Sequence, residues 1–116
     1  MIENQRDEQR TLELRKLGIF EDRRSWISFA GHVYLQGYDR SRLRALVRED
    51  ADGICYVCKN KARFDGDMDH IEGGLGPQRC DCYHTKLANG KKHTNVGWIH
   101  GMFSRKACHQ KKHHRI

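Results

Sequence analysis

The sequence predicts a small α+β domain, because short alternating and helical hydrophobic patterns follow one another along a chain of only 116 residues. Hydrophobic residues make up 37% of the chain, so the core is thin and needs an additional source of stability. The chain has five cysteines and eight histidines, which favours a bound metal ion in that role. We expect an N-terminal helical arm at residues 1–24 and the main domain at residues 25–116.

The first half of the chain is expected to form two helices and a hairpin. Residues 3–17 are rich in helix formers with charges of alternating sign and predict a solvated helix. Within residues 26–38, hydrophobic residues recur at every second position on either side of a glycine, which predicts a short β-hairpin. Residues 41–50 carry one apolar stripe and predict a helix, which either Asp39 or Ser41 can cap.

The second half is expected to fold as two strands followed by a helix. It begins with the Cys-x-x-Cys pair at residues 55–58. Residues 64–71 and 94–99 predict the two strands, and residues 105–113 predict the last helix. Both tryptophans, Trp26 and Trp98, are expected in the core, since a thin core needs large side chains.

Basic residues gather in the same half. The net charge of the whole chain is +7. Residues 1–54 carry ten Lys and Arg against ten Asp and Glu, whereas residues 55–116 carry twelve against five and seven of the eight histidines. A basic surface favours the phosphate backbone of a nucleic acid as the partner, because each neutralised phosphate releases counterions. It could also serve solubility alone.

The cysteine pattern points to zinc. The thiolates of Cys55 and Cys58 are spaced to enter one tetrahedral site. The remaining ligands must come from elsewhere in the chain, and four of the five cysteines are expected to hold one structural zinc ion. Besides Cys55 and Cys58, the candidates are Cys80, Cys82 and Cys108, with His84 as a further donor. An odd number of cysteines argues against a secreted disulfide framework. No segment approaches the length of a membrane span and no signal peptide is recognisable, so we expect no membrane partner and a cytoplasmic location.

A second group of residues suits phosphodiester hydrolysis, which needs a base for water and a cation for the developing negative charge. His70 suits the base, because its pKa lies near working pH. Its neighbour Asp69 would bind the metal, together with His109 on the last helix. His113, one helical turn further along, would bind the metal or a phosphate. Asn95 would lock a loop or orient His70.

These residues resemble the HNH family of nucleases, the ββα-metal or His-Me finger group. The resemblance covers roughly residues 30–114 and is carried best by Cys55-x-x-Cys58, Asp69-His70-Ile71 and Cys108-His109-x-x-x-His113, with Gly73-Gly74 and Asn95 as further matches. It implies a zinc-stabilised ββα-metal fold in which His70 is the general base and Asn95 the middle residue. It also implies that Asp69 and His109 bind a catalytic magnesium, manganese or similar ion, beside a four-cysteine zinc site.

The chain departs from the family pattern in two places. Arg105 stands where the first cysteine of a second Cys-x-x-Cys pair is usual, and Asn95 lies further before His109 than is common. An alternative register replaces Cys108 and His109 with Cys82 and His84 and resembles the phage resolvase-type endonucleases. It leaves the basic final helix without a role.

The resulting hypothesis is a metal-dependent DNA endonuclease of phage or mobile-element type, acting in the cytoplasm of a bacterial or phage-infected cell on double-stranded DNA. Cleavage as a homodimer and nicking as a monomer both fit one site per chain. The residues expected to contact DNA are Lys91, Lys92, Arg105, Lys106, Lys111 and Lys112. Two alternatives remain: a non-catalytic zinc-knuckle module that binds nucleic acid, and a small subunit of a larger nucleic-acid machine.

Overall fold

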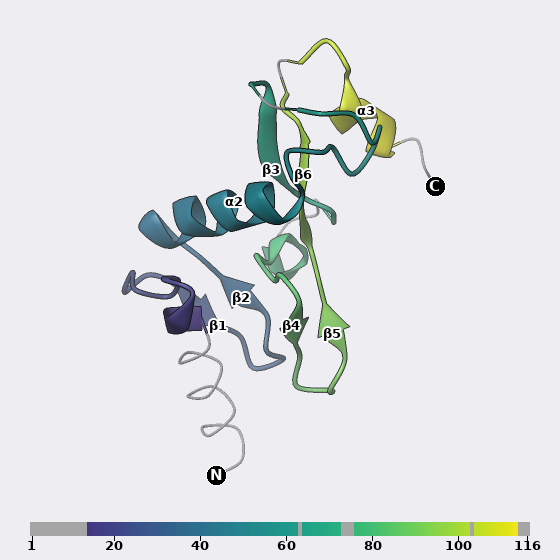
Figure 1. The fold of residues 1–116 in the computed structure, drawn as a ribbon. Helices are drawn as coiled ribbons and strands as arrows, with labels where there is room; N and C mark the ends of the chain where they lie inside the picture. The colour runs from purple at the N-terminus through teal and green to yellow at the C-terminus, as the bar shows by residue number, and fades with distance from the viewer. Residues whose placement is uncertain (1–13, 63, 73–75, 103, 114–116) are drawn as a thin grey trace. The chain divides into compact units, whose positions relative to one another are not determined.

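The computed structural model describes residues 14–62, 64–72, 76–102 and 104–113 (Figure 1). They belong to two compact units, the first built from residues up to 43 and from 72–95, and the second from residues 44–71 and from 96 onward. Most of the helix predicted at 3–17 lies outside the described residues. None of the helices among the described residues is long and apolar enough to cross a membrane.

Two small antiparallel sheets form the first unit. Strands β1 (Trp26–Ile27) and β2 (Val33–Tyr34) pair as a hairpin, which confirms the hairpin predicted at residues 26–38. A 3₁₀ turn η1 (Gly76–Arg79) leads to a second hairpin of β4 (Thr85–Lys86) and β5 (Lys92–His93). Each strand is only two residues long, so hydrogen bonds between strands stabilise this unit little.

Helix α2 (Tyr38–Asp50) starts earlier than predicted, and the side chain of Asp39 anchors a preceding loop. The Asp39 carboxylate is fully buried and accepts hydrogen bonds from the backbone amides of Glu21 and Asp22 at 2.8 and 2.9 Å. It also accepts one from the hydroxyl of Ser25 at 2.6 Å. Three donors satisfy the buried charge, and they hold residues 21–25 against the start of the helix.

The second unit has the predicted strand–strand–helix order. Strands β3 (Gly66–His70) and β6 (Val96–His100) pair antiparallel along their whole length, and α3 (Cys108–His113) follows. Trp98 is 1% exposed, and its indole N–H donates to the carbonyl of Ala62 at 3.0 Å. The chain is therefore α+β, with its longest strands and its last helix in one unit.

The two tryptophans differ in environment. Trp98 lies in the core, as predicted, but Trp26 is 53% exposed and stacks on Tyr34 with ring centroids 4.5 Å apart. The core prediction for Trp26 was wrong because the hairpin that carries it has only one strand pair, which leaves one face of the ring uncovered.

Candidate functional site

The Cys-x-x-Cys segment forms a tight turn in the second unit. Ile54 and Lys61 pair across it as an isolated bridge. Inside that bridge, the amide of Cys55 donates to the carbonyl of Asn60, and the amide of Lys59 donates back to the carbonyl of Cys55, both at 2.9 Å. This double closure turns the chain back on itself within six residues and brings both cysteines to the same side.

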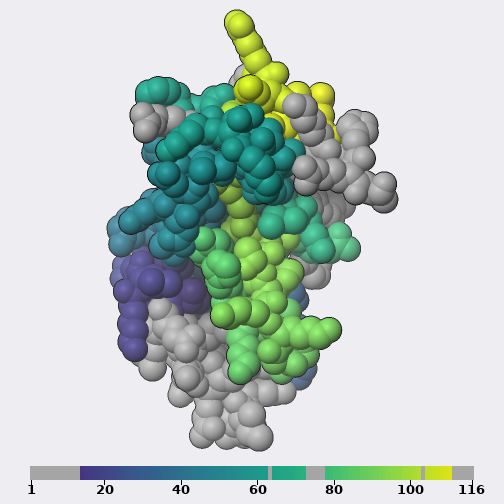
Figure 2. Space-filling view, turned by 45° about the vertical axis from the view of Figure 1, so that its right-hand side comes forward, coloured from purple at the N-terminus to yellow at the C-terminus, as the bar shows by residue number. Residues whose placement is uncertain are grey.

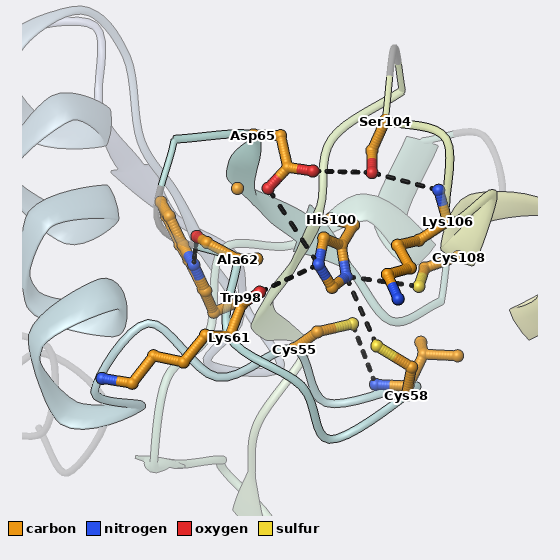
Figure 3. Close-up of polar contacts among 12 residues, drawn as sticks. Cys55, Cys58, Lys61, Ala62, Asp65, Trp98, His100, Ser104, Lys106 and Cys108 are labelled. Carbon is orange, nitrogen blue, oxygen red and sulfur yellow. Dashed lines mark hydrogen bonds and ion pairs between the residues drawn. The ribbon is translucent and has the colours of Figure 1, made fainter.

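Four metal-ligating side chains meet at this turn. They are Cys55, Cys58, Cys108 and His100, and their donor atoms lie within 4.8 Å of one another. The His100 Nδ1 atom lies 3.4 Å from the sulfur of Cys58 and 3.5 Å from that of Cys108 (Figure 3). Tetrahedral zinc with sulfur at about 2.3 Å and nitrogen at about 2.05 Å places these two atoms about 3.6 Å apart. The group can therefore hold a structural metal ion such as zinc.

The orientation of His100 supports a ligand role. Its Nε2 atom lies 3.1 Å from the carbonyl oxygen of Lys61 and 4.0 Å from the carboxylate of Asp65 (Figure 3). A carbonyl can only accept, so Nε2 carries the proton and Nδ1 presents its lone pair to the sulfurs. A hydrogen bond from the remote ring nitrogen to a carbonyl is the usual arrangement at metal-bound histidines.

The electrostatics of the three thiols also fit a cation. Burial opposes ionisation of Cys55, but hydrogen bonds from the backbone amides of Cys58, His100 and Val57 outweigh it and lower its pKa to about 6. Burial, together with Cys55 and Cys58, raises the pKa of Cys108 to about 12. Several adjacent thiolates repel one another without a cation, and a bound divalent ion removes this conflict.

The other two cysteines lie elsewhere. Cys80 and Cys82 belong to the first unit, where they gather with His32 and His93. The structure therefore divides the five cysteines between two groups instead of bringing four of them to one zinc site. The physical reason is the topology, because the segment between β3 and β6 folds with the N-terminal hairpin and carries its cysteines with it.

Sequence reasoning missed three ligand candidates, namely His32, His93 and His100. The number of cysteines was the available signal. One four-cysteine site leaves one of the five cysteines unused, whereas two sites that combine cysteines with histidines use all five. His84 of the alternative register is exposed and lies outside both groups. Its backbone amide and its Nδ1 atom contact the hydroxyl of Thr94 at 2.9 and 3.3 Å.

Asp69 and His109 come together in the second unit. His109 is the second residue of α3, and its Nδ1 atom lies 3.6 Å from the Asp69 Oδ1 atom. The other oxygen of Asp69 accepts a hydrogen bond from the Tyr56 hydroxyl at 2.9 Å. Because Tyr56 fixes one carboxylate oxygen, the second oxygen is held toward the imidazole.

His70 is the last residue of β3 and pairs with Val96 on β6. Like Asp69, it is 9% exposed. Successive side chains of a strand point to opposite faces, so Asp69 and His70 are placed on different faces of the β3–β6 pair. The two side chains can therefore serve different roles.

Asn95 belongs to the first unit and holds a loop there. Its side-chain nitrogen donates to the carbonyls of Gln78 and Cys80 at 3.0 and 2.9 Å, and its side-chain oxygen accepts from the amide of Glu72 at 2.8 Å. The side chain is 1% exposed. These contacts assign Asn95 the loop-locking part of its expected role.

The basic residues expected at DNA are partly described. Lys91, in the turn between β4 and β5, and Lys92, the first residue of β5, are both exposed. This segment is coloured green in Figure 2. Arg105 and Lys106 are exposed before α3. The side chains of Lys111, Lys112 and His113 lie outside the described residues.

Comparison of the chain with models of known protein families found no match, and neither did comparisons with curated proteins and with solved structures. The resemblance to HNH nucleases therefore remains a prediction from the residues quoted for it.

Proposed function

We propose that this chain is a metal-dependent nuclease of the ββα-metal type that hydrolyses phosphodiester bonds in DNA. The observation that carries the proposal is the 3.6 Å distance between the Asp69 carboxylate on β3 and the His109 imidazole on α3. The neighbouring residue on β3, His70, supplies an imidazole, the side chain that most often serves as a general base.

The pair of donors fits a small divalent cation. Two neighbouring ligand atoms at about 2.1 Å from one octahedral ion lie about 3.0 Å apart, so the observed separation of 3.6 Å would shorten by about 0.6 Å when the ion binds. Asp69 and His109 would hold such an ion, magnesium or manganese, which supplies charge stabilisation for the departing oxygen. His70 would accept a proton from the attacking water, and Tyr56 keeps the carboxylate of Asp69 in place.

The cysteine–histidine centre positions this pair without taking part in hydrolysis. His109 directly follows Cys108, and Tyr56 lies between Cys55 and Cys58. A zinc ion at this centre would fix α3 and the knuckle to the end of β6. The spacing between His109 and Asp69 would then depend on the zinc ion, although neither residue ligates it.

The test is cleavage of supercoiled plasmid by the full chain in magnesium or manganese, with EDTA as a parallel reaction. The proposal predicts relaxed or linear product with either metal and none with EDTA. Replacing His70 by alanine should lower the cleavage rate by at least about a hundredfold, the usual contribution of a general base, while zinc content and DNA binding stay unchanged.

His84→Ala is the matched control, because it removes an exposed histidine that lies outside both metal-ligand groups. It should cleave as the unmodified chain does. Loss of cleavage in His84→Ala with retention in His109→Ala would instead support the alternative register. DNA binding without cleavage in any metal would refute the nuclease and leave the zinc-knuckle binding module.

A further inference from the structure

Four potential metal ligands also converge in the first unit, whereas Asp69, His70 and His109 belong to the second. His32 lies just before β2, His93 ends β5, and Cys80 and Cys82 lie on the segment after η1. Their donor atoms are within 4.8 Å of one another. The sulfur of Cys80 lies 3.4 Å from Nε2 of His93, and that of Cys82 lies 3.8 Å from Nδ1 of His32. Both distances are close to the value of about 3.6 Å for neighbouring ligands of tetrahedral zinc.

The backbone around these ligands is fixed by hydrogen bonds. The amide of Val33 donates to the sulfur of Cys82 at 3.3 Å, and its carbonyl accepts from the amide of Asp81 at 2.7 Å. The Asp81 carboxylate accepts in turn from the amide of Leu35 at 2.7 Å. The segment that carries Cys80 and Cys82 is thus hydrogen-bonded to β2 and to the residue that follows it. The N–H···S contact is of the kind that supports metal-bound thiolates.

Asn95 holds the same segment from its other side. Its backbone amide donates to the carbonyl of Cys82 at 2.9 Å, and its side chain donates to the carbonyl of Cys80 at the same distance. Both cysteines of the group are therefore positioned through their carbonyls by one buried residue, which uses its backbone amide for Cys82 and its side chain for Cys80. Asn95 is a positioning residue for this group.

The simpler explanation is that two buried cysteines pack beside two histidines. The four side chains differ in burial. Cys80 and Cys82 are 1% and 0% exposed, whereas His32 and His93 are of intermediate exposure. A thiol–imidazole hydrogen bond accounts for each nitrogen–sulfur contact taken singly, but not for the gathering of all four donor atoms within 4.8 Å of one another. Packing alone also leaves two hairpins of two-residue strands without enough stabilisation.

We propose that His32, Cys80, Cys82 and His93 form a second zinc centre, which joins the β1–β2 hairpin to the β4–β5 hairpin. The full chain then binds two zinc ions, one in each compact unit. The centre is structural, because two histidines and two cysteines complete the tetrahedron and leave no position for water. This proposal stands independently of nuclease activity.

The experiment is a measurement of zinc per chain on the full-length protein, purified and dialysed against a weak chelator. We expect two zinc ions in the unmodified protein and one in His93→Ala. His93→Cys, which replaces one zinc ligand by another, should retain two, and so should His84→Ala, which removes an exposed histidine from the same unit. Cys58→Ser should lose the other ion.

Substitution with cobalt distinguishes the two centres even if a variant unfolds in part. A site with three sulfurs and one nitrogen absorbs at longer wavelength than one with two of each, so the unmodified chain should show both sets of bands. His93→Ala should lose only the two-sulfur set. One zinc per chain with the same content in His93→Ala would overturn the proposal, as would a cobalt spectrum with the three-sulfur bands alone.

Discussion

Replacing His100 by alanine tests the zinc centre of the second unit most directly. The side chain is 2% exposed, presents Nδ1 to two sulfurs and uses Nε2 to bind the carbonyl of Lys61. Alanine removes one of four ligands and one hydrogen bond, and it leaves the Cys55, Cys58 and Cys108 thiols without the imidazole. None of the proposed catalytic residues is changed.

The expected loss follows from the energy of structural zinc sites. Zinc binding in small domains contributes about 10–16 kcal/mol for four ligands, so an equal share per ligand is about 3 kcal/mol. Loss of one ligand should therefore weaken zinc binding about a hundredfold. At about 4 °C per kcal/mol for a chain of this size, the zinc-loaded protein should unfold about 12 °C lower.

The assay is thermal unfolding at fixed zinc concentration, with zinc affinity from competition against a chromophoric chelator. His100→Cys should restore most of the loss, because it returns a fourth ligand, and His84→Ala should unfold as the unmodified chain does. An unchanged zinc affinity and unfolding temperature in His100→Ala would refute a ligand role for His100 and leave the group without its fourth donor.

Three other predictions concern packing and protons. Gly97→Ala should destabilise the second unit by about 1–3 kcal/mol in urea unfolding, because the new methyl would lie 2.8 Å from the ring of Tyr56; an unchanged midpoint would contradict this packing. Trp98→Ala should cost about 3–5 kcal/mol and Trp26→Ala no more than about 1.5, since only Trp98 is buried; equal losses would place both rings in the core. Zinc binding at neutral pH should release at least one proton, that of Cys108, whose pKa is raised to about 12, so apparent affinity should rise by at least about tenfold per pH unit. Calorimetry in two buffers of different ionisation enthalpy measures that proton, and equal heats would exclude its release.

The strand–strand–helix order could be predicted because its signals are local. Strand β3 lies inside the segment predicted at residues 64–71, and β6 overlaps the segment predicted at residues 94–99 and runs one residue past it. The last helix begins at Cys108 instead of Arg105. Ser104 explains the difference: its hydroxyl donates to the carboxylate of Asp65 at 2.7 Å and accepts from the amide of Lys106 at 3.2 Å. Both hydrogen bonds hold the residues just before α3 in a non-helical conformation.

The partners of the metal ligands could not be predicted from spacing. Cys55 and Cys58 are recognisable because only two residues separate these ligands, which share one turn. His100 and His32 reach their cysteines only through pairings distant in sequence, and a lone histidine carries no local mark of such a contact. The buried Asp39 is a similar case, because a position near a helix start suggested a cap while its partners lie in an earlier loop.

The order of residues along the chain suggests why a zinc centre and a hydrolytic site would lie in the same unit. Tyr56 and His109 each neighbour a zinc-ligand candidate, and each contacts Asp69 from a different segment. In a unit with so thin a core, packing alone cannot fix the positions of those segments to within a fraction of an ångström, whereas metal–ligand bonds can. Under the proposed function, loss of zinc should therefore abolish cleavage even when magnesium is abundant and His70 is intact.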